Sequence, residues 1–175
     1  MDNKKQLYLS LAFPIALMFG WLGLVMLERA NATTVQIPIR GFDPRDLLSG
    51  HYLTYQLDFG DVKVCGDRYS EESICVCLDN SNAPAKPTHA ASCADTTCPL
   101  FLKGNCKYGT FNAGVERFYF SEKYTKELAI VPQKSNIELK ITDVGVGYVE
   151  DLIIDGKRVA EWLKAEKAKA NETNL

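Results

Sequence analysis

An uncharged run of 21 residues, Leu7 to Leu27, constrains this chain more than any other feature of its sequence. As an α-helix rising 1.5 Å per residue, the run would extend about 30 Å, which is the thickness of a bilayer's hydrocarbon core. Pro14 removes one helical hydrogen bond, a loss that membrane helices tolerate. We therefore expect residues 7–27 to form one transmembrane helix in contact with membrane lipid.

The charges that flank this run predict its orientation. Lys4 and Lys5 precede it, whereas Glu28 and Arg29 follow it and cancel each other. Because positively charged flanks remain in the cytoplasm, residues 1–6 are expected there. The chain beyond the helix is then expected outside the cytosol.

Two alternatives to a membrane anchor exist for the same run. Ala30-Asn31-Ala32 has the small-x-small pattern of a signal-peptidase site, which suggests a cleaved signal peptide. The run is longer than the 7–15 residues typical of a signal-peptide apolar region, which favours the anchor. A buried helix of a soluble protein is the second alternative, and it alone would leave the remaining chain in the cytosol.

The rest of the chain has the size of one domain and a slight negative charge. About 148 residues follow the run (175 − 27), enough for a single hydrophobic core. Of 20 basic and 22 acidic residues, Lys4, Lys5 and Asp2 precede the run, which leaves 18 against 21. Nucleic-acid binding would require a basic patch, and the sequence shows none, so no nucleic-acid partner is expected.

Six cysteines fall within one window of 42 residues after the apolar run: Cys65, Cys75, Cys77, Cys93, Cys98 and Cys106. An even number of cysteines in an exported domain indicates three disulfides. Cys75 and Cys77 are two residues apart, so on a strand both thiols would point to one face. We expect them to bond to different partners rather than to each other.

The polar stretch from Asp79 to Thr97 contains Pro84, Pro87 and several alanines, and it is predicted to be a loop without a core of its own. Disulfides would stabilise such a loop by about 2–4 kcal/mol per bridge, because they restrict the unfolded chain. This would account for Cys93 and Cys98 within it.

A metal site is the alternative use of these cysteines, because His89 lies among them and His51 lies upstream. Zinc sites favour C-x₂₋₄-C spacing, which Cys93 and Cys98 alone satisfy. Redox catalysis is not indicated, since the sequence lacks a C-x-x-C pair. We expect disulfides and no cofactor.

The first part of the exported domain reads as two strands joined by a tight loop. Val35, Ile37 and Ile39 alternate with other residues, as in a half-buried strand. Asp43-Pro44 predicts a turn, because proline disfavours helical backbone in its predecessor. Gly50 supplies a second reversal, and residues 52–59 form the next strand.

At this point the chain resembles the GDYXXLXY family of membrane-anchored bacterial proteins. The name-giving motif corresponds to Gly50-His51-Tyr52-Leu53-Thr54-Tyr55-Gln56-Leu57. Gly50 and Tyr52 match it, whereas His51 replaces the aspartate, Tyr55 the leucine and Leu57 the second tyrosine. Two later blocks, 114–124 and 152–156, extend the resemblance to about residue 163.

The resemblance carries no established activity, but it has consequences for location and partners. Such proteins are similar to ones that accompany integral membrane proteins, which implies a multi-pass membrane partner. It also implies the bacterial inner (cytoplasmic) membrane, with the C-terminal domain in the periplasm.

Alternating apolar residues predict further strands over 115–120, 137–141 and 149–154, the last followed by an Asp155-Gly156 turn. Ser121 is a candidate N-cap for a short helix ending at Leu128. Val159, Trp162 and Leu163 form the apolar stripe of a C-terminal helix.

These elements predict a mainly β (α+β) domain with an antiparallel sheet, one short helix and one C-terminal helix. The expected boundaries are a linker over 28–34, a periplasmic domain over 35–164 with a cysteine-rich insertion over 65–106, and a flexible tail over 165–175.

Two functional classes follow. The first is a non-enzymatic accessory protein that docks on its membrane partner through the residues of the motif loop: Asp43, Pro44, Arg45, Asp46, Gly50, His51, Tyr52 and Tyr55. For these residues, turn formation and sheet packing are simpler explanations than chemistry. The second is a membrane-tethered hydrolase, for which Ser49 would be the nucleophile, although the sequence offers no evident base for it.

Overall fold

A computed structural model describes residues 3–45, 52–66, 70–95, 97–124, 128 and 134–173. The chain divides into two compact units, Met1–Ala32 and Thr33–Leu175. Asn31 and Ala32 lie between the helix that ends at Ala30 and the strand that begins at Thr33.

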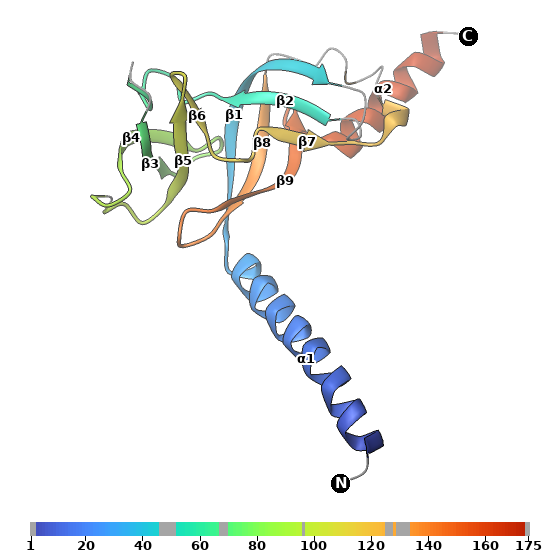
Figure 1. The fold of residues 1–175 in the computed structure, drawn as a ribbon. Helices are drawn as coiled ribbons and strands as arrows, with labels where there is room; N and C mark the ends of the chain where they lie inside the picture. The colour runs from blue at the N-terminus through green and yellow to red at the C-terminus, as the bar shows by residue number, and fades with distance from the viewer. Residues whose placement is uncertain are drawn as a thin grey trace. The chain divides into compact units, whose positions relative to one another are not determined.

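The first unit is the helix α1, Asn3–Ala30, with Pro14 inside it (Figure 1). Its segment Ser10–Ala30 has 21 residues with a mean hydropathy of 2.0, and none of these residues is buried. By length and composition this helix suits a membrane span. The structure thus confirms a helix over the predicted segment.

The second unit contains two antiparallel sheets (Figure 1). The six-stranded sheet has the order β10-β9-β8-β1-β2-β7, formed by Lys157–Arg158, Gly147–Ile154, Ser135–Ile141, Thr33–Arg45, Tyr52–Leu57 and Arg117–Tyr119. The four-stranded sheet has the order β4-β3-β5-β6, formed by Lys86–Ser92, Ser70–Asp79, Phe101–Lys107 and Thr110–Asn112. The mainly β, antiparallel prediction is confirmed.

Strand β1 lies inside the larger sheet, between β8 and β2. Its alternating apolar side chains face the interior. Val35, Ile37 and Ile39 are at most 3% exposed. β1 pairs with β8 from Thr33, opposite Ile141, to Ile39, opposite Ser135. The period-two pattern therefore identified both this strand and its buried face.

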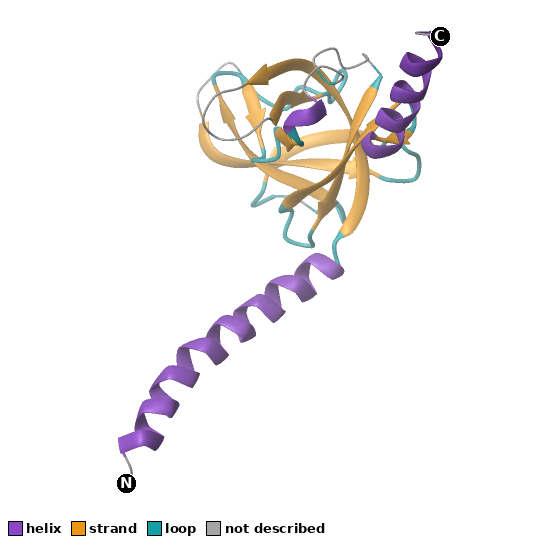
Figure 2. Cartoon of the chain, turned by 90° about the vertical axis from the view of Figure 1, so that its right-hand side faces the viewer, coloured by secondary structure: helices purple, strands orange, loops and turns teal. Residues whose placement is uncertain are grey.

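The strands of the second unit curve around a common interior, as Figure 2 shows. Side chains from both sheets form one core, to which the larger sheet contributes Leu53 and Tyr55 and the smaller sheet Val76 and Leu102. This core holds β2 in place, and β2 in turn supports β7.

Asp43 and Pro44 do not form the predicted turn. They belong to β1, where they pair with Thr54 and Leu53 of β2 after a bulge between Arg40 and Asp43. Pairing of β1 with β8 ends at Ile39, so Pro44 lies where β1 has a neighbour on one side, a position that tolerates a missing N–H. The reversal into β2 falls outside the described residues.

The predicted loop over Asp79–Thr97 contains a strand, β4, and the prediction was wrong there. β4 pairs antiparallel with β3 along Lys86–Ser92. It is an edge strand, so Pro87 does not interrupt pairing on a second side. Its low strand propensity is offset by this pairing and by two disulfides that attach the following segment to β3.

The C-terminal elements agree with the sequence up to the end of the last helix. Asp155 and Gly156 form the predicted turn, with φ of 49° and 76°. The helix α2, Val159–Thr173, buries Leu163 and packs Trp162 against the core. It continues beyond Ala165, where a tail was expected, because the alanine, lysine and glutamate residues there favour helix.

The short helix predicted after Ser121 is a single 3₁₀ turn, η1, over Glu122–Tyr124. The backbone N–H of Tyr124 donates to the carbonyl of Ser121 at 2.9 Å. The N–H of Leu128 donates to the carbonyl of Tyr124 at 3.0 Å, and the residues between these two lie outside the described part of the chain.

Candidate functional site

A groove with a volume of about 590 Å³ lies between the segment that enters β7 and the start of β9. Val115 and Arg117 line one side, and Gly147 and Val149 line the other. Within the described residues, β7 has β2 as its hydrogen-bonded neighbour and ends the larger sheet. The groove therefore borders an open strand edge, a feature through which proteins pair with extended segments.

An exposed aromatic cluster, which we define as Tyr52, Arg117 and Tyr119, adjoins the groove. Tyr52 and Tyr119 are directly opposite each other on β2 and β7, and their ring centroids are 5.6 Å apart. The guanidinium carbon of Arg117 lies 5.3 Å from the centroid of the Tyr52 ring. Tyr119 is 58% exposed and Arg117 is also exposed, whereas Tyr52 is half-buried, so the cluster presents Arg117 and Tyr119 to solvent.

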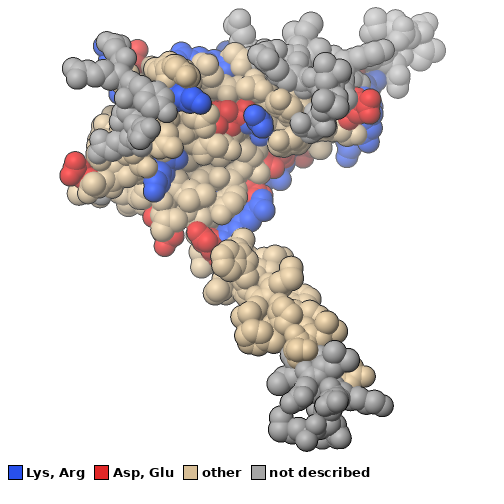
Figure 3. Space-filling view, viewed as in Figure 1, with Lys and Arg blue, Asp and Glu red and all other residues tan. Residues whose placement is uncertain are grey.

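The contacts of Arg117 leave its charge available. Its guanidinium lies over the face of Tyr52 in a cation–π arrangement. Among the described residues, Arg117 forms no ion pair with an acidic side chain. On the face of the domain seen in Figure 3, basic and acidic side chains are interspersed on a largely uncharged surface rather than gathered by sign. The described residues of this face therefore form no basic patch of the kind that a polyanion would need.

Tyr55, a predicted partner-binding residue, lies in the core instead, at 1% exposure. Its hydroxyl donates a hydrogen bond to the carbonyl of Val115. Burial, and secondarily the charge of Glu116, raises the pKa of this phenol above its ordinary value of 10.0. Tyr55 therefore supports the wall of the groove from the inside.

Hydrogen bonds from main-chain N–H groups hold the same wall in place. The Glu116 carboxylate accepts the N–H of Ala113 at 2.5 Å, and the Asn112 side-chain oxygen accepts the N–H of Gly114 at 3.1 Å. The carbonyl of Glu116 accepts the N–H of Tyr55 at 3.2 Å. Glu116 thus acts as a structural acceptor, which limits its use as a catalytic base.

The structure describes some of the other residues that were predicted to bind a partner, and the rest lie outside its described part. Arg45 pairs with Tyr52, and Tyr52 with Tyr119, so these three positions form one row across β1, β2 and β7. Asp43 and Pro44 continue β1 beside this row. Asp46, Ser49, Gly50 and His51 lie outside the described residues.

One polar network was missed from the sequence. Glu138 on β8 is 8% exposed and accepts hydrogen bonds from Gln36 at 3.3 Å and from Arg158 at 3.0 Å. Arg158 also lies 3.8 Å from Asp151. In the sequence, the sign of this network was Glu138, a charged residue between two strand positions that alternation predicts to be buried. The network joins β1, β8, β9 and β10 through Gln36, Glu138, Asp151 and Arg158.

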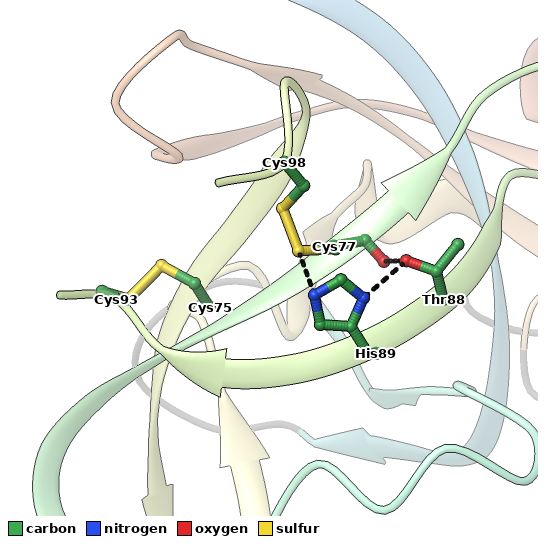
Figure 4. The surroundings of a disulfide bond; sticks show 6 residues. All are labelled: Cys75, Cys77, Thr88, His89, Cys93 and Cys98. Carbon is green, nitrogen blue, oxygen red and sulfur yellow. Dashed lines mark hydrogen bonds between the residues drawn. A yellow bond between two sulfur atoms is a disulfide. The ribbon is translucent and has the colours of Figure 1, made fainter. Parts of the chain in front are cut away.

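The six cysteines form three disulfides, as predicted: Cys65–Cys106, Cys75–Cys93 and Cys77–Cys98. Cys75 and Cys77 bond to different partners, and they leave β3 on the same side (Figure 4). With every cysteine paired, no thiolate is available to ligate the metal considered as an alternative. The segment after β4 is thereby attached to β3 of the smaller sheet.

The fold and the site together define a β domain with three disulfides, following an apolar helix that can span a membrane. The chain belongs to the GDYXXLXY family, described as GDYXXLXY protein, whose profile matches residues 16–152. The match extends from α1 to β9 and includes the groove, which confirms the resemblance seen in the motifs. Comparisons with curated proteins and with solved structures gave no match.

Proposed function

We propose that this protein is a non-enzymatic accessory protein, anchored in a membrane by α1, whose disulfide-linked domain docks on a multi-pass membrane protein. The observation that carries the proposal is the exposed aromatic cluster beside the groove. Tyrosine and arginine are the residues most enriched at protein interfaces, where they supply large contact areas and charge-assisted hydrogen bonds.

The geometry of the groove favours docking over hydrolysis. Its carboxylate, Glu116, is already engaged by a backbone N–H. Such a surface has the shape and chemistry to receive a segment of another protein. A partner with an acidic side chain opposite Arg117 would satisfy the available guanidinium.

The location we propose is the bacterial inner membrane, with residues 1–6 in the cytoplasm and the domain in the periplasm. Two observations support it. Lys4 and Lys5 precede the apolar helix, and positive flanks remain cytoplasmic. Three disulfides require an oxidising compartment for their formation, which the periplasm provides.

Site-specific photo-crosslinking of the full chain in native membranes tests the docking. A photoreactive residue at Tyr119 should give a covalent adduct that mass spectrometry identifies as a multi-pass membrane protein. Tyr108, which is 84% exposed on the β5–β6 turn, is the matched control and should give little adduct. Equal yields at the two positions, or free monomer alone from Tyr119, would contradict the proposal.

Protease treatment of spheroplasts tests the location. Externally added protease should degrade the domain while a short N-terminal fragment remains in the membrane. Protection of the whole chain until the cells are lysed would place the domain in the cytoplasm. Release of the domain into the periplasmic fraction without protease would instead indicate cleavage near Ala30-Asn31-Ala32.

A further inference from the structure

We infer that Cys77–Cys98 is an exchangeable disulfide, at which an external protein dithiol opens and closes a cross-link with His89 as the proton donor. This inference depends on the smaller sheet and is independent of the proposed docking function. It begins from two disulfides, Cys75–Cys93 and Cys77–Cys98, that leave the same side of β3 (Figure 4).

The two disulfides are alike in accessibility. Cys75 and Cys77, on β3, are 0% and 1% exposed, and each bonds to a half-buried cysteine in the segment after β4. An attacking thiolate can therefore reach Cys93 or Cys98 but neither sulfur on β3. In both disulfides the buried β3 sulfur is the leaving group.

The two disulfides differ in the neighbour of that leaving group. On β4, His89 pairs with Cys77, whereas Ala91 pairs with Cys75. The Nε2 atom of His89 lies 3.4 Å from the sulfur of Cys77. An imidazole therefore faces one leaving group, and a methyl group occupies the equivalent position beside the other.

Thr88 orients this imidazole. Its hydroxyl donates to the carbonyl of Cys77 at 3.3 Å, and its oxygen lies 3.3 Å from Nδ1 of His89 (Figure 4). Because the hydroxyl proton is used, Nδ1 acts as the donor to the Thr88 oxygen, which leaves Nε2 directed at the sulfur. When the ring carries its second proton, Nε2 can donate that proton to Cys77. His89 is exposed, so the ring can regain a proton from water.

The exchange balances in two steps. A thiolate of the external dithiol attacks the sulfur of Cys98; the Cys77–Cys98 bond breaks, and its electron pair passes to Cys77, which takes the proton from Nε2 of His89. In the mixed disulfide, the first sulfur of the dithiol is bonded to Cys98. The second thiolate of the dithiol then attacks that first sulfur and releases Cys98 as a thiolate. The dithiol leaves oxidised by two electrons, and the reverse sequence restores the cross-link.

A proton donor beside the leaving sulfur accelerates such exchange, because it stabilises the charge that develops on that sulfur as the disulfide breaks. A leaving sulfur that is stabilised in this way departs faster. The kind of partner is therefore a dithiol oxidoreductase of the compartment that holds the domain. Opening Cys77–Cys98 would detach the segment after β4 at one point, while Cys75–Cys93 keeps it attached at another.

The test uses the full chain in detergent with its disulfides intact. Limited treatment with dithiothreitol at neutral pH, acid quenching and alkylation, followed by peptide mass mapping, gives the rate at which each pair opens. Cys77 and Cys98 should be alkylated first, about tenfold faster than Cys75 and Cys93. Equal rates for the two pairs would overturn the inference.

Two reciprocal variants separate the effect of His89 from that of exposure. His89→Ala should slow Cys77–Cys98 to the rate of Cys75–Cys93, and Ala91→His should accelerate Cys75–Cys93. Lys103 pairs with Cys75 on the β5 side, so Lys103→Ala is included and should leave the order unchanged. If His89→Ala leaves the order of opening intact, the inference is wrong. An unchanged rate for Cys65–Cys106 in each variant shows that the domain remains folded.

Discussion

The side chain of Tyr55 on β2 and the carbonyl of Val115, two residues before β7, are joined by a hydrogen bond inside the core. The backbone N–H of Tyr55 also donates to the carbonyl of Glu116 at 3.2 Å. One residue of β2 thus holds the inner wall of the candidate groove through both its side chain and its main chain. The family motif position occupied by Tyr55 is therefore structural in this chain.

Tyr55→Phe should destabilise the domain by about 1–3 kcal/mol, because it leaves the Val115 carbonyl without its partner in a buried site. Urea unfolding of the full chain in mild detergent, with disulfides intact, measures this change in the free energy of unfolding. Tyr119→Phe is the control, since its exposed ring should change stability by less than about 0.5 kcal/mol. Equal stability of Tyr55→Phe and the parent chain would contradict a structural role for the hydroxyl.

The raised pKa of Tyr55 predicts a loss of stability in alkali. In the unfolded chain the phenol ionises near pH 10, whereas burial keeps it protonated in the folded domain at that pH. Its contribution is therefore fully present below about pH 10 and is lost as the pH rises further. Above about pH 10 the parent chain should lose stability more steeply than Tyr55→Phe. Parallel curves for the two proteins would contradict the prediction.

Regular alternation made most of the fold predictable. Val35, Ile37 and Ile39 identified β1, and Ile137, Leu139 and Ile141 identified β8, because period-two patterns bury one face of a strand. The even cysteine count and the spacing of Cys75 and Cys77 predicted three disulfides and excluded a bond between these two residues. Connectivity did not follow, because it depends on which strands become neighbours.

Two of the errors came from proline. Pro44 and Pro87 both indicated turns or loops, yet each lies in a strand with one neighbour at that point. Proline is disfavoured in central strands but is tolerated in edge strands. The sequence alone does not define which strands lie at an edge, because that depends on the tertiary arrangement. The groove was missed for the same reason, since Arg117 and Val149 are separated in sequence and meet only when the sheet curves.

Gly104→Ala should destabilise the domain by about 1–3 kcal/mol, because a Cβ atom there would lie 2.6 Å from the carbonyl oxygen of Asn112 and 2.5 Å from the Phe111 ring. The backbone of β6 would have to move away from β5. Gly66→Ala is the matched control, because a Cβ atom there meets nothing within 4 Å. Thermal unfolding followed by circular dichroism compares the two variants, and equal melting temperatures would contradict the expected clash.

Removal of Cys65–Cys106 should cost more stability than removal of either other disulfide. It closes 41 residues of sequence, against 18 for Cys75–Cys93 and 21 for Cys77–Cys98. For isolated loops of these lengths, loop-closure entropy gives about 4 kcal/mol for the longest and about 3 kcal/mol for the shorter ones. With the other disulfides intact all three loops are shorter, but Cys65–Cys106 still closes the longest. Paired Cys→Ser variants and urea unfolding test this ranking. The opposite ranking would show that native-state packing outweighs chain entropy.

Arg158 contacts two carboxylates of similar burial at different distances, which allows a direct comparison. Its guanidinium lies 3.0 Å from Glu138 and 3.8 Å from Asp151, and their side chains are 11% and 18% exposed. Double-mutant cycles with Arg158→Ala should give a coupling of about 1 kcal/mol with Glu138 and less than about 0.5 kcal/mol with Asp151. Both values are reduced because the arginine side chain is 61% exposed. A larger coupling with Asp151 than with Glu138 would contradict this ranking.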